Sequence, residues 1–217
     1  MPLPTKERLV LHSHERQAID FVLANAPVHS VLDIGCGDGR TSGILSGEYS
    51  LTVTAFDIDA NAIERARYRY PNIDFSVLDA QDMSRFADNI FDAAIFSANG
   101  MGLIPTVEGR HKCLAEVARV LRPGGMFIYS AHSLHGLFRH HDPKRILRNN
   151  FHRVLRGDSY LTNIDRNGTA MSLYHGTPAR EQKDLAKAGL KLLAKFQREW
   201  FDHWPYYVAQ KPDSRDE

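Results

Sequence analysis

Short apolar runs alternate with helix-like segments over the first 130 residues, and this alternation is the feature that most constrains the fold. The runs cover residues 31–34, 51–56, 73–78, 91–96 and 126–130. In the segments between them, apolar residues recur at the three- and four-residue spacing of an amphipathic helix. Strands that alternate with helices in this way predict a mostly parallel sheet with helices on both faces.

Start and stop signals place the helices within this alternation. The first helix is expected over residues 15–25, ahead of Pro27, and another begins near Arg40. Asp59 can cap the next helix, because an aspartate at the N-cap accepts hydrogen bonds from the first backbone N–H groups. A further helix over residues 110–121 precedes the fifth strand.

The alternation is interrupted after the fifth strand. Residues 142–157 carry the amphipathic stripe of a helix, and the pair Asn167-Gly168 is a strong hairpin signal. We therefore expect a helix-plus-hairpin insertion over about residues 132–176. Two later runs, residues 191–200 and 206–210, predict a closing antiparallel pair of strands.

The predicted fold is a single α/β domain over residues 1–217, with a Rossmann-like, doubly wound, mostly parallel seven-stranded sheet. The formal net charge is +1, so no whole-molecule field would attract DNA or RNA. No apolar run approaches the length that crosses a bilayer, and the N-terminal residues do not resemble a signal peptide. The two cysteines, Cys36 and Cys113, lack a metal-binding spacing. We expect a reduced, cytoplasmic setting with no DNA or membrane partner.

A glycine-rich loop, Gly35-Cys36-Gly37-Asp38-Gly39, follows the first predicted strand and opens a helix. Glycine allows the backbone to turn tightly and lets a ligand approach it closely. The spacing G-x-G-x-G differs from the G-x-G-x-x-G of dinucleotide-binding folds. Such a loop is shared by many nucleotide binders, and its spacing weighs against a dinucleotide.

Acidic residues lie at the ends of neighbouring predicted strands. Asp33 lies within the first strand, Asp57 ends the second and Asp79 ends the third. A carboxylate at the position of Asp57 can accept both hydroxyls of a ribose. Asp79 and the backbone N–H of Ala80 suit the amino group and a ring nitrogen of adenine. Because ligands bind at the carboxyl edge of open α/β sheets, these residues predict one nucleoside site.

Five segments, taken in order, resemble the signatures of class I S-adenosylmethionine-dependent methyltransferases, with the closest likeness to the group that acts on small molecules. The resemblance implies that S-adenosyl-L-methionine is the cofactor. The segments are Val31–Gly39 (VLDIGCGDG), Phe56–Asp59, Val77–Ala80, Phe91–Phe96 and Leu121–Gly125.

The resemblance also assigns roles to individual residues. The glycine loop would meet the methionine end of the cofactor, and Asp33 would help to hold its amino group through water. Asp57 would take the ribose hydroxyls, and Asp79 the adenine amino group. Ser97 lies where the fourth strand opens onto the transferable methyl group. The complete set of implied cofactor-binding residues is Asp33, Gly35, Gly37, Gly39, Asp57, Ile58, Asp79, Ala80 and Ser97.

The candidate catalytic residues lie at the two ends of the insertion. A hydroxyl acceptor benefits from a base, usually histidine. His132 is the best candidate because it directly follows the fifth strand, and His175 and His135 come next. Tyr174 lies beside His175 at the returning end. We expect both ends to lie near the transferable methyl group and the middle of the insertion to cover the site as a lid.

The acceptor is expected to be a small molecule that reacts through an O or N atom. The basic run from Arg139 to Arg156 favours an acceptor with an anionic group. The exit of the fourth strand, Ser97-Ala98-Asn99-Gly100, lacks the Asn/Asp-Pro-Pro-Tyr turn of enzymes that methylate base amines. It also lacks the acidic ligand of metal-dependent catechol-type enzymes, so we expect no bound metal.

Three alternatives stay open. An RNA methyltransferase could use the basic run to follow phosphates, although no separate RNA-binding module is visible. An NAD(P)-dependent oxidoreductase would share the fold, but the glycine spacing and Asp79 argue against it. A non-catalytic protein that binds S-adenosylmethionine and regulates a partner enzyme would show the same sequence features.

Overall fold

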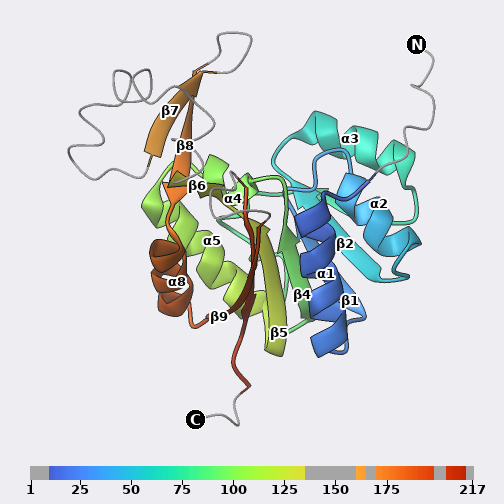
Figure 1. Ribbon diagram of the computed structural model, residues 1–217. Helices are drawn as coiled ribbons and strands as arrows, with labels where there is room; N and C mark the ends of the chain where they lie inside the picture. The colour runs from blue at the N-terminus through green and yellow to red at the C-terminus, as the bar shows by residue number, and fades with distance from the viewer. Residues whose placement is uncertain (1–9, 135–159, 165–169, 198–203, 214–217) are drawn as a thin grey trace.

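The computed structural model describes residues 10–134, 160–164, 170–197 and 204–213 (Figure 1). The predicted helix over residues 142–157 and the Asn167-Gly168 turn lie outside these ranges. The described helices are α1 (Ser13–Asn25), α2 (Arg40–Gly47), α3 (Ala60–Arg69), α4 (Gly100–Leu103), α5 (Val107–Val120) and α8 (Pro178–Lys187). The described strands are β1 (Ser30–Ile34), β2 (Thr52–Asp57), β3 (Asp74–Val77), β4 (Phe91–Phe96), β5 (Leu121–Ser130), β6 (His132–Ser133), β7 (Tyr160–Ile164), β8 (Ala170–Gly176), β9 (Lys191–Phe196) and β10 (Tyr206–Gln210).

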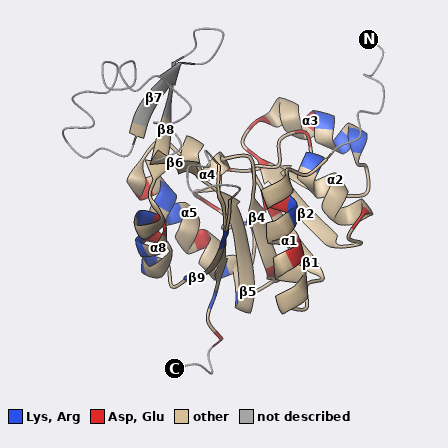
Figure 2. Ribbon diagram, viewed as in Figure 1, with Lys and Arg blue, Asp and Glu red and all other residues tan. Residues whose placement is uncertain are grey.

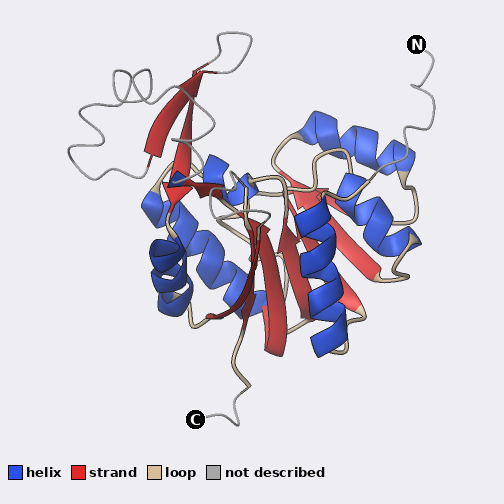
Figure 3. Ribbon diagram, in the orientation of Figure 1, coloured by secondary structure: helices blue, strands red, loops and turns tan. Residues whose placement is uncertain are grey.

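The main sheet has seven strands in the order β3-β2-β1-β4-β5-β10-β9. Strands β1 to β5 pair in parallel with their neighbours. Strand β10 is antiparallel to both β5 and β9. This arrangement confirms the predicted Rossmann-like, mostly parallel seven-stranded sheet with a closing antiparallel pair. Figure 3 shows the strands as a central layer with helices on both sides.

Two hydrophobic clusters cover the two faces of the sheet, because alternate side chains of each strand point to opposite faces. On one face, Val31 and Ile128 pack with residues of α1, α2 and α3. On the other face, Leu32 and Phe127 pack with residues of α5 and α8. Both faces are therefore buried, as expected for a parallel sheet whose strands are apolar along their whole length.

The observed boundaries differ from the expected ones where a local cap decides them. Helix α5 begins at Val107, three residues earlier than predicted, because the Thr106 side chain accepts a hydrogen bond from Gly109 N–H. Leu121 pairs with Phe91, and a register shift separates this pair from the pairing of Ala93 with Met126, so β5 begins earlier than residue 126 and is irregular at residues 122–125. The short helix α4 and the two-residue strand β6 were not predicted. Neither element is long enough to show a periodic pattern.

The described strands β7 and β8 form the predicted strand pair, and they contact the main domain through Ile104, Arg110 and β6. Strands β7 and β8 are antiparallel. Strand β8 also pairs in parallel with β6, which brings His132 opposite His175 and Ser133 opposite Gly176. The two ends of the insertion therefore lie side by side.

Charged side chains lie mainly on the outer helices, with Lys and Arg prominent on α8, while the central strands carry few (Figure 2). This distribution fits a sheet that is buried on both faces. Among the described helices, none combines the length and the apolar character needed to cross a membrane.

Candidate cofactor and acceptor sites

The glycine loop leads from β1 into α2 with three glycines in left-handed backbone conformation. The φ angles are +62° at Gly35, +54° at Gly37 and +80° at Gly39, which is also the N-cap of α2. L-residues with a side chain rarely adopt such angles. The spacing G-x-G-x-G is therefore needed for the path of the backbone as well as for access by a ligand.

The ring of Phe96 fills the space between two glycines, and sequence analysis did not identify it. A Cβ atom added to Gly35 would lie 2.5 Å from Phe96 Cε2, and one added to Gly100 would lie 1.8 Å from the same atom. Neither position can carry a side chain unless the ring moves. Phe96 thus packs the end of β4 directly against the glycine loop.

Asp57 is held by backbone groups at the end of β2. Its Oδ2 accepts a hydrogen bond from Gly37 N–H at 2.8 Å, and its Oδ1 accepts one from Asp59 N–H at 2.9 Å. A carboxylate has about four lone-pair sites, so two further donors can still bind. Asp57 is half-buried and lines a cavity, as required for the predicted contact with ribose hydroxyls.

This cavity has a volume of about 240 Å³ and lies among the loops that follow β1, β2, β3 and β4. Asp79 lines it and is oriented by the N–H of Gln81, which donates to Asp79 Oδ1 at 2.9 Å. Ile58 is 71% exposed on the opposite wall. An apolar side chain held in this exposed position beside two carboxylates suits the flat face of adenine. Seven of the lining residues carry the cofactor assignment or extend it: Gly35, Asp57, Ile58, Asp79, Ala80, Gln81 and Ser97.

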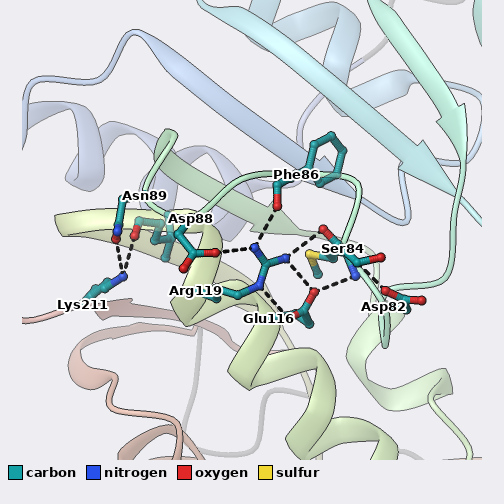
Figure 4. A network of polar contacts seen from close by, with 10 residues as sticks. Asp82, Ser84, Phe86, Asp88, Asn89, Glu116, Arg119 and Lys211 are labelled. Carbon is teal, nitrogen blue, oxygen red and sulfur yellow. Dashed lines mark hydrogen bonds and ion pairs between the residues drawn. The ribbon is translucent and has the colours of Figure 1, made fainter.

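Arg119 on α5 fixes the segment that follows Asp79 (Figure 4). Its guanidinium donates to the carbonyl oxygens of Met83 and Phe86 and forms ion pairs with Glu116 and Asp88. Glu116 in turn accepts a hydrogen bond from Met83 N–H at 2.7 Å. The loop between β3 and β4 is therefore held by α5 through residues that do not line the cavity.

Asp33 lies under the glycine loop rather than in the cavity wall. It is 1% exposed, and its Oδ2 accepts a hydrogen bond from Ser42 Oγ at 2.5 Å. Burial raises the pKa of the Asp33 carboxyl to about 7, against the lowering effect of the Ser42 hydrogen bond. The predicted water-mediated contact with the cofactor amino group stays a prediction.

A second, larger cavity of about 610 Å³ adjoins the first. Its wall comes from segments far apart in the chain: the start of α1, the turn after β4, the end of β5, β6, β8 and the start of β10. Ala98 and Leu103 line both cavities. The turn after β4 is therefore the place where the two cavities meet.

Glu15 on α1 is a buried carboxylate at this junction, and sequence analysis did not identify it. Its Oε1 accepts hydrogen bonds from Thr41 Oγ1 at 3.0 Å and Ser97 Oγ at 2.6 Å. Arg40 donates to both carboxylate oxygens at 2.9 Å. Burial alone would raise the pKa of Glu15, but the hydrogen bonds and charge of Arg40, with the Ser97 bond, lower it below the ordinary value. Glu15 thus joins α1 to the helix after the glycine loop and to the end of β4.

Tyr206 extends this chain of hydrogen bonds to the wall of the larger cavity. Its hydroxyl lies 2.7 Å from Ser97 Oγ. An ionised carboxylate only accepts hydrogen bonds, so the Ser97 proton points to Glu15. The Tyr206 hydroxyl must then donate to Ser97.

The signal for this cluster that was available in the sequence was Glu15 itself, a single acid on the same helix face as Ala18 and Val22.

His132 lines the larger cavity, as expected for an acceptor-side residue. Its Nδ1 accepts a hydrogen bond from the indole N–H of Trp204 at 3.0 Å. The proton of the neutral ring is therefore on Nε2 in this arrangement. A role as the proton acceptor would require this contact to break, so His132 as general base stays a prediction.

The other two candidate catalytic residues lie behind the cavity. His175 is fully buried, and its Nδ1–H donates a hydrogen bond to the carbonyl oxygen of Leu173. The centroid of its ring lies 5.2 Å from that of His132. The guanidinium of Arg110 stacks on the Tyr174 ring, with Arg110 Cζ 3.7 Å from the ring centroid. Neither side chain lines the cavity, so their contact with an acceptor stays a prediction. His135 lies outside the described residues.

Among the described residues, no cluster of three or more His, Cys, Asp or Glu side chains is arranged to hold a metal ion. Cys36 is buried in the glycine loop, and Cys113 is buried in the core beneath α5. Burial raises the pKa of both thiols. Neither thiol is prepared for nucleophilic or metal-binding chemistry.

Comparison with known proteins supports this assignment of the cofactor side. Residues 31–125 match the family model described as a methyltransferase domain. The chain contains a class I S-adenosylmethionine-dependent methyltransferase domain, and the dinucleotide oxidoreductase alternative is set aside. The matched range includes the glycine loop, Asp57, Asp79 and the whole of the smaller cavity wall.

Curated relatives share this part of the chain. The chain is 34% identical over 135 residues to a fatty-acid O-methyltransferase of Mycolicibacterium smegmatis. The aligned region covers 60% of this chain and 47% of that protein. The chain is also 37% identical over 111 residues to the ubiquinone/menaquinone biosynthesis C-methyltransferase UbiE of Desulfotalea psychrophila. That aligned region covers 48% of this chain and 43% of the relative. The chain thus spans less than half the length of these two relatives.

The fold is shared over more of the chain than the sequence similarity is. A solved S-adenosylmethionine-dependent methyltransferase from Methanosarcina mazei superimposes with a TM-score of 0.75. The match covers 89% of this chain and 98% of that one at 22% identity. At this level of identity the match establishes the common fold.

Proposed function

We propose that the protein transfers the methyl group of S-adenosyl-L-methionine to a small molecule bound in the larger cavity. The observation that carries this proposal is the arrangement of the two cavities, which share Ala98 and Leu103 as wall residues. One cavity has the carboxylates and the apolar residue that suit an adenosine group. The other, of about 610 Å³, is large enough for a small organic acceptor.

The residues present fit the cofactor. Asp57 would accept the ribose hydroxyls, Asp79 the adenine amino group, and Ile58 would cover the adenine face. The loop from Gly35 to Gly39 would receive the methionine end. When bound, the cofactor supplies a sulfonium-bound methyl group that a nucleophile can displace. The protein has to place the nucleophile in line and to exclude water, and orientation alone can supply a large part of the rate enhancement.

The acceptor atom is expected to be O or N, and the names of the two relatives, one an O- and one a C-methyltransferase, add carbon to this set. The wall of the larger cavity combines apolar side chains such as Leu103 and Leu173 with polar ones such as His132 and Tyr206. This mixture supports a largely apolar acceptor with a polar reacting group. The basic run that favours an anionic acceptor, and the middle of the proposed lid, lie outside the described residues.

Binding and turnover experiments test the proposal in sequence. Calorimetric titration should show binding of S-adenosylmethionine and S-adenosylhomocysteine and none of NAD. A screen with methyl-labelled cofactor against fatty acids, phenols, quinols and a structured RNA should then give transfer to small molecules. Absence of cofactor binding would overturn the proposal. Binding without transfer to any compound would favour the non-catalytic regulator, and transfer to the RNA alone would favour the RNA methyltransferase.

A cavity-filling variant locates the acceptor. Ser13 is exposed at the start of α1 and lines the larger cavity only. Ser13→Trp should raise the KM for the acceptor and leave the affinity for S-adenosylhomocysteine unchanged. Gln17→Trp is the matched control, because Gln17 is exposed on the same helix and lines neither cavity. Equal kinetics in the two variants would place the acceptor elsewhere.

A further inference from the structure

Asn99 occupies an unusual position at the junction of the two cavities. It follows β4, lines the larger cavity and has a φ angle of +64°. The preceding Ala98 has a φ angle of +51°. Two successive non-glycine residues in left-handed conformation are unfavourable and are found mainly where function requires them.

The backbone of this turn is fixed without help from the Asn99 side chain. Asn99 N–H donates to Ser130 Oγ at 2.7 Å, and its carbonyl oxygen accepts from Gly102 N–H at 2.8 Å. Asn99 is the N-cap of α4, yet its side chain makes no capping hydrogen bond. One structural reason for asparagine at an N-cap, a side-chain capping bond, is therefore absent, although asparagine does tolerate the left-handed φ.

The side-chain amide is buried without a partner. Asn99 is 6% exposed, and its Oδ1 accepts no hydrogen bond from any residue in the described part of the chain. A buried polar atom of this kind is destabilising unless a donor reaches it. Rotation about the last side-chain bond exchanges Oδ1 and Nδ2, so the oxygen can be turned toward the cavity without any movement of the backbone.

The neighbouring polar groups already have partners. The Tyr206 hydroxyl donates to Ser97, which donates to Glu15. Ser130 Oγ accepts the hydrogen bond from Asn99 N–H, and His132 Nδ1 accepts the one from Trp204. Asn99 Oδ1 is itself buried, so the rotation of the amide group is what would present an unpaired oxygen at the junction to a donor on a ligand.

We propose that Asn99 binds the methyl acceptor, with its side-chain oxygen accepting a hydrogen bond from the O–H or N–H group that becomes methylated. This rests on the proposed function. It defines the acceptor class as one with a hydroxyl or amine proton, such as a phenol or an alcohol. A carboxylate has no proton to donate, and its oxygens would repel Oδ1. A methylated product without its O–H would lose the contact.

Phenol and anisole, its methyl ether, form a matched pair of probes. Binding is measured by NMR on protein saturated with S-adenosylhomocysteine, with benzoate as the anionic comparison. Wild-type protein should bind phenol roughly five- to tenfold more tightly than anisole, as expected for one net hydrogen bond. Asn99→Gly should remove this preference while anisole affinity is kept, since glycine accepts the left-handed backbone. Asn99→Asp keeps an acceptor oxygen and tolerates the same φ, so it should retain the preference.

Asn89→Gly is the matched control. Asn89 also has a positive φ, +58°, but it lies outside both cavity walls. Equal affinity of the wild-type protein for phenol and anisole, no binding of either, or a preference that survives in Asn99→Gly would overturn the assignment of Asn99. The affinity for S-adenosylhomocysteine, measured in every variant, separates this result from a failure of the proposed function.

Discussion

The two cavities are built from very different parts of the chain. Among the described residues, those that line the smaller one lie between Gly35 and Pro105, most of them close to the end of a parallel strand. The larger one is lined by residues from His12 to Tyr206, including both ends of the insertion. Under the proposed function, cofactor binding would therefore depend on local loop–strand units, and acceptor binding on contacts between segments remote in sequence. Substitutions on the two sides should fail in different ways.

The largest difference should appear in the pH dependence of stability, through Asp33 under the cofactor loop. Its pKa of about 7 in the folded protein exceeds the ordinary value of 3.8, so the folded state holds a proton that the unfolded state loses between these values. The contribution of Asp33 to the free energy of unfolding is complete below about pH 4 and is lost as the pH rises to about 7. Over this range the free energy of unfolding falls by up to about 1.4 kcal/mol per pH unit. Urea unfolding at several pH values should show this slope in the wild-type protein and not in Asp33→Asn. The exposed Asp74→Asn is the control, and equal slopes in all three proteins would contradict the assignment.

Removal of Glu15 should cost the most stability at neutral pH. Glu15→Ala leaves Arg40 without its carboxylate, and loss of one partner of a buried pair costs about 3 kcal/mol. Because the pKa of Glu15 is lowered in the folded protein, Glu15 adds stability at pH values above its ordinary pKa of 4.5, and this stability is lost as the pH falls below that value. The pH dependence due to Glu15 is therefore opposite in direction to that due to Asp33.

Glu48→Ala is the matched control for Glu15, because Glu48 pairs with Arg16 on the surface. An exposed ion pair of this kind contributes about 0–1 kcal/mol. If chemical denaturation gave the same free-energy change for both variants, the buried cluster would have no special role in joining α1 to the cofactor side.

Asp57→Ala should act on binding, and it also removes the two backbone hydrogen bonds that Asp57 accepts from Gly37 and Asp59. Loss of the ribose contacts should weaken S-adenosylhomocysteine by about 1–3 kcal/mol, the range for polar groups left unpaired. Calorimetry measures this loss directly, and Asp74→Ala serves as the control on the neighbouring strand. An unchanged dissociation constant in Asp57→Ala would remove the ribose assignment.

Tyr206→Phe should have the smallest effect. The substitution removes one hydrogen bond to Ser97 and keeps the ring, so the free energy of unfolding should fall by about 0.5–1.5 kcal/mol. The affinity for S-adenosylhomocysteine should not change, because Tyr206 lines only the acceptor cavity. Tyr68→Phe, at a tyrosine that is 74% exposed, should change neither quantity. Weaker cofactor binding in Tyr206→Phe would show that the two sides are coupled.

The same comparison explains how much could be predicted from the sequence. The sheet, the glycine loop, Asp57 and Asp79 were predictable because each lies at a fixed place beside a strand, and strand periodicity is a local signal. Glu15 and Tyr206 were missed because their partners are remote in sequence. Phe96 and Asn99 were missed because a periodic pattern does not show which side chain packs on a glycine or lines a cavity. Tyr174 and His175 lie at the predicted end of the insertion, but periodicity does not reveal whether a side chain faces a cavity or the core.

The chain of hydrogen bonds from Glu15 through Ser97 to Tyr206 has a consequence for biosynthesis. It joins residues separated by 82 and then 109 positions. A ribosome must therefore release residue 206 before this chain can close, even though every residue of the cofactor cavity wall has emerged about a hundred residues earlier. Contacts between such distant positions form late, because the intervening loops have to be closed first. A nascent chain could then acquire its nucleoside-binding half well before its acceptor wall is assembled, and early S-adenosylmethionine binding would stabilise that half during translation.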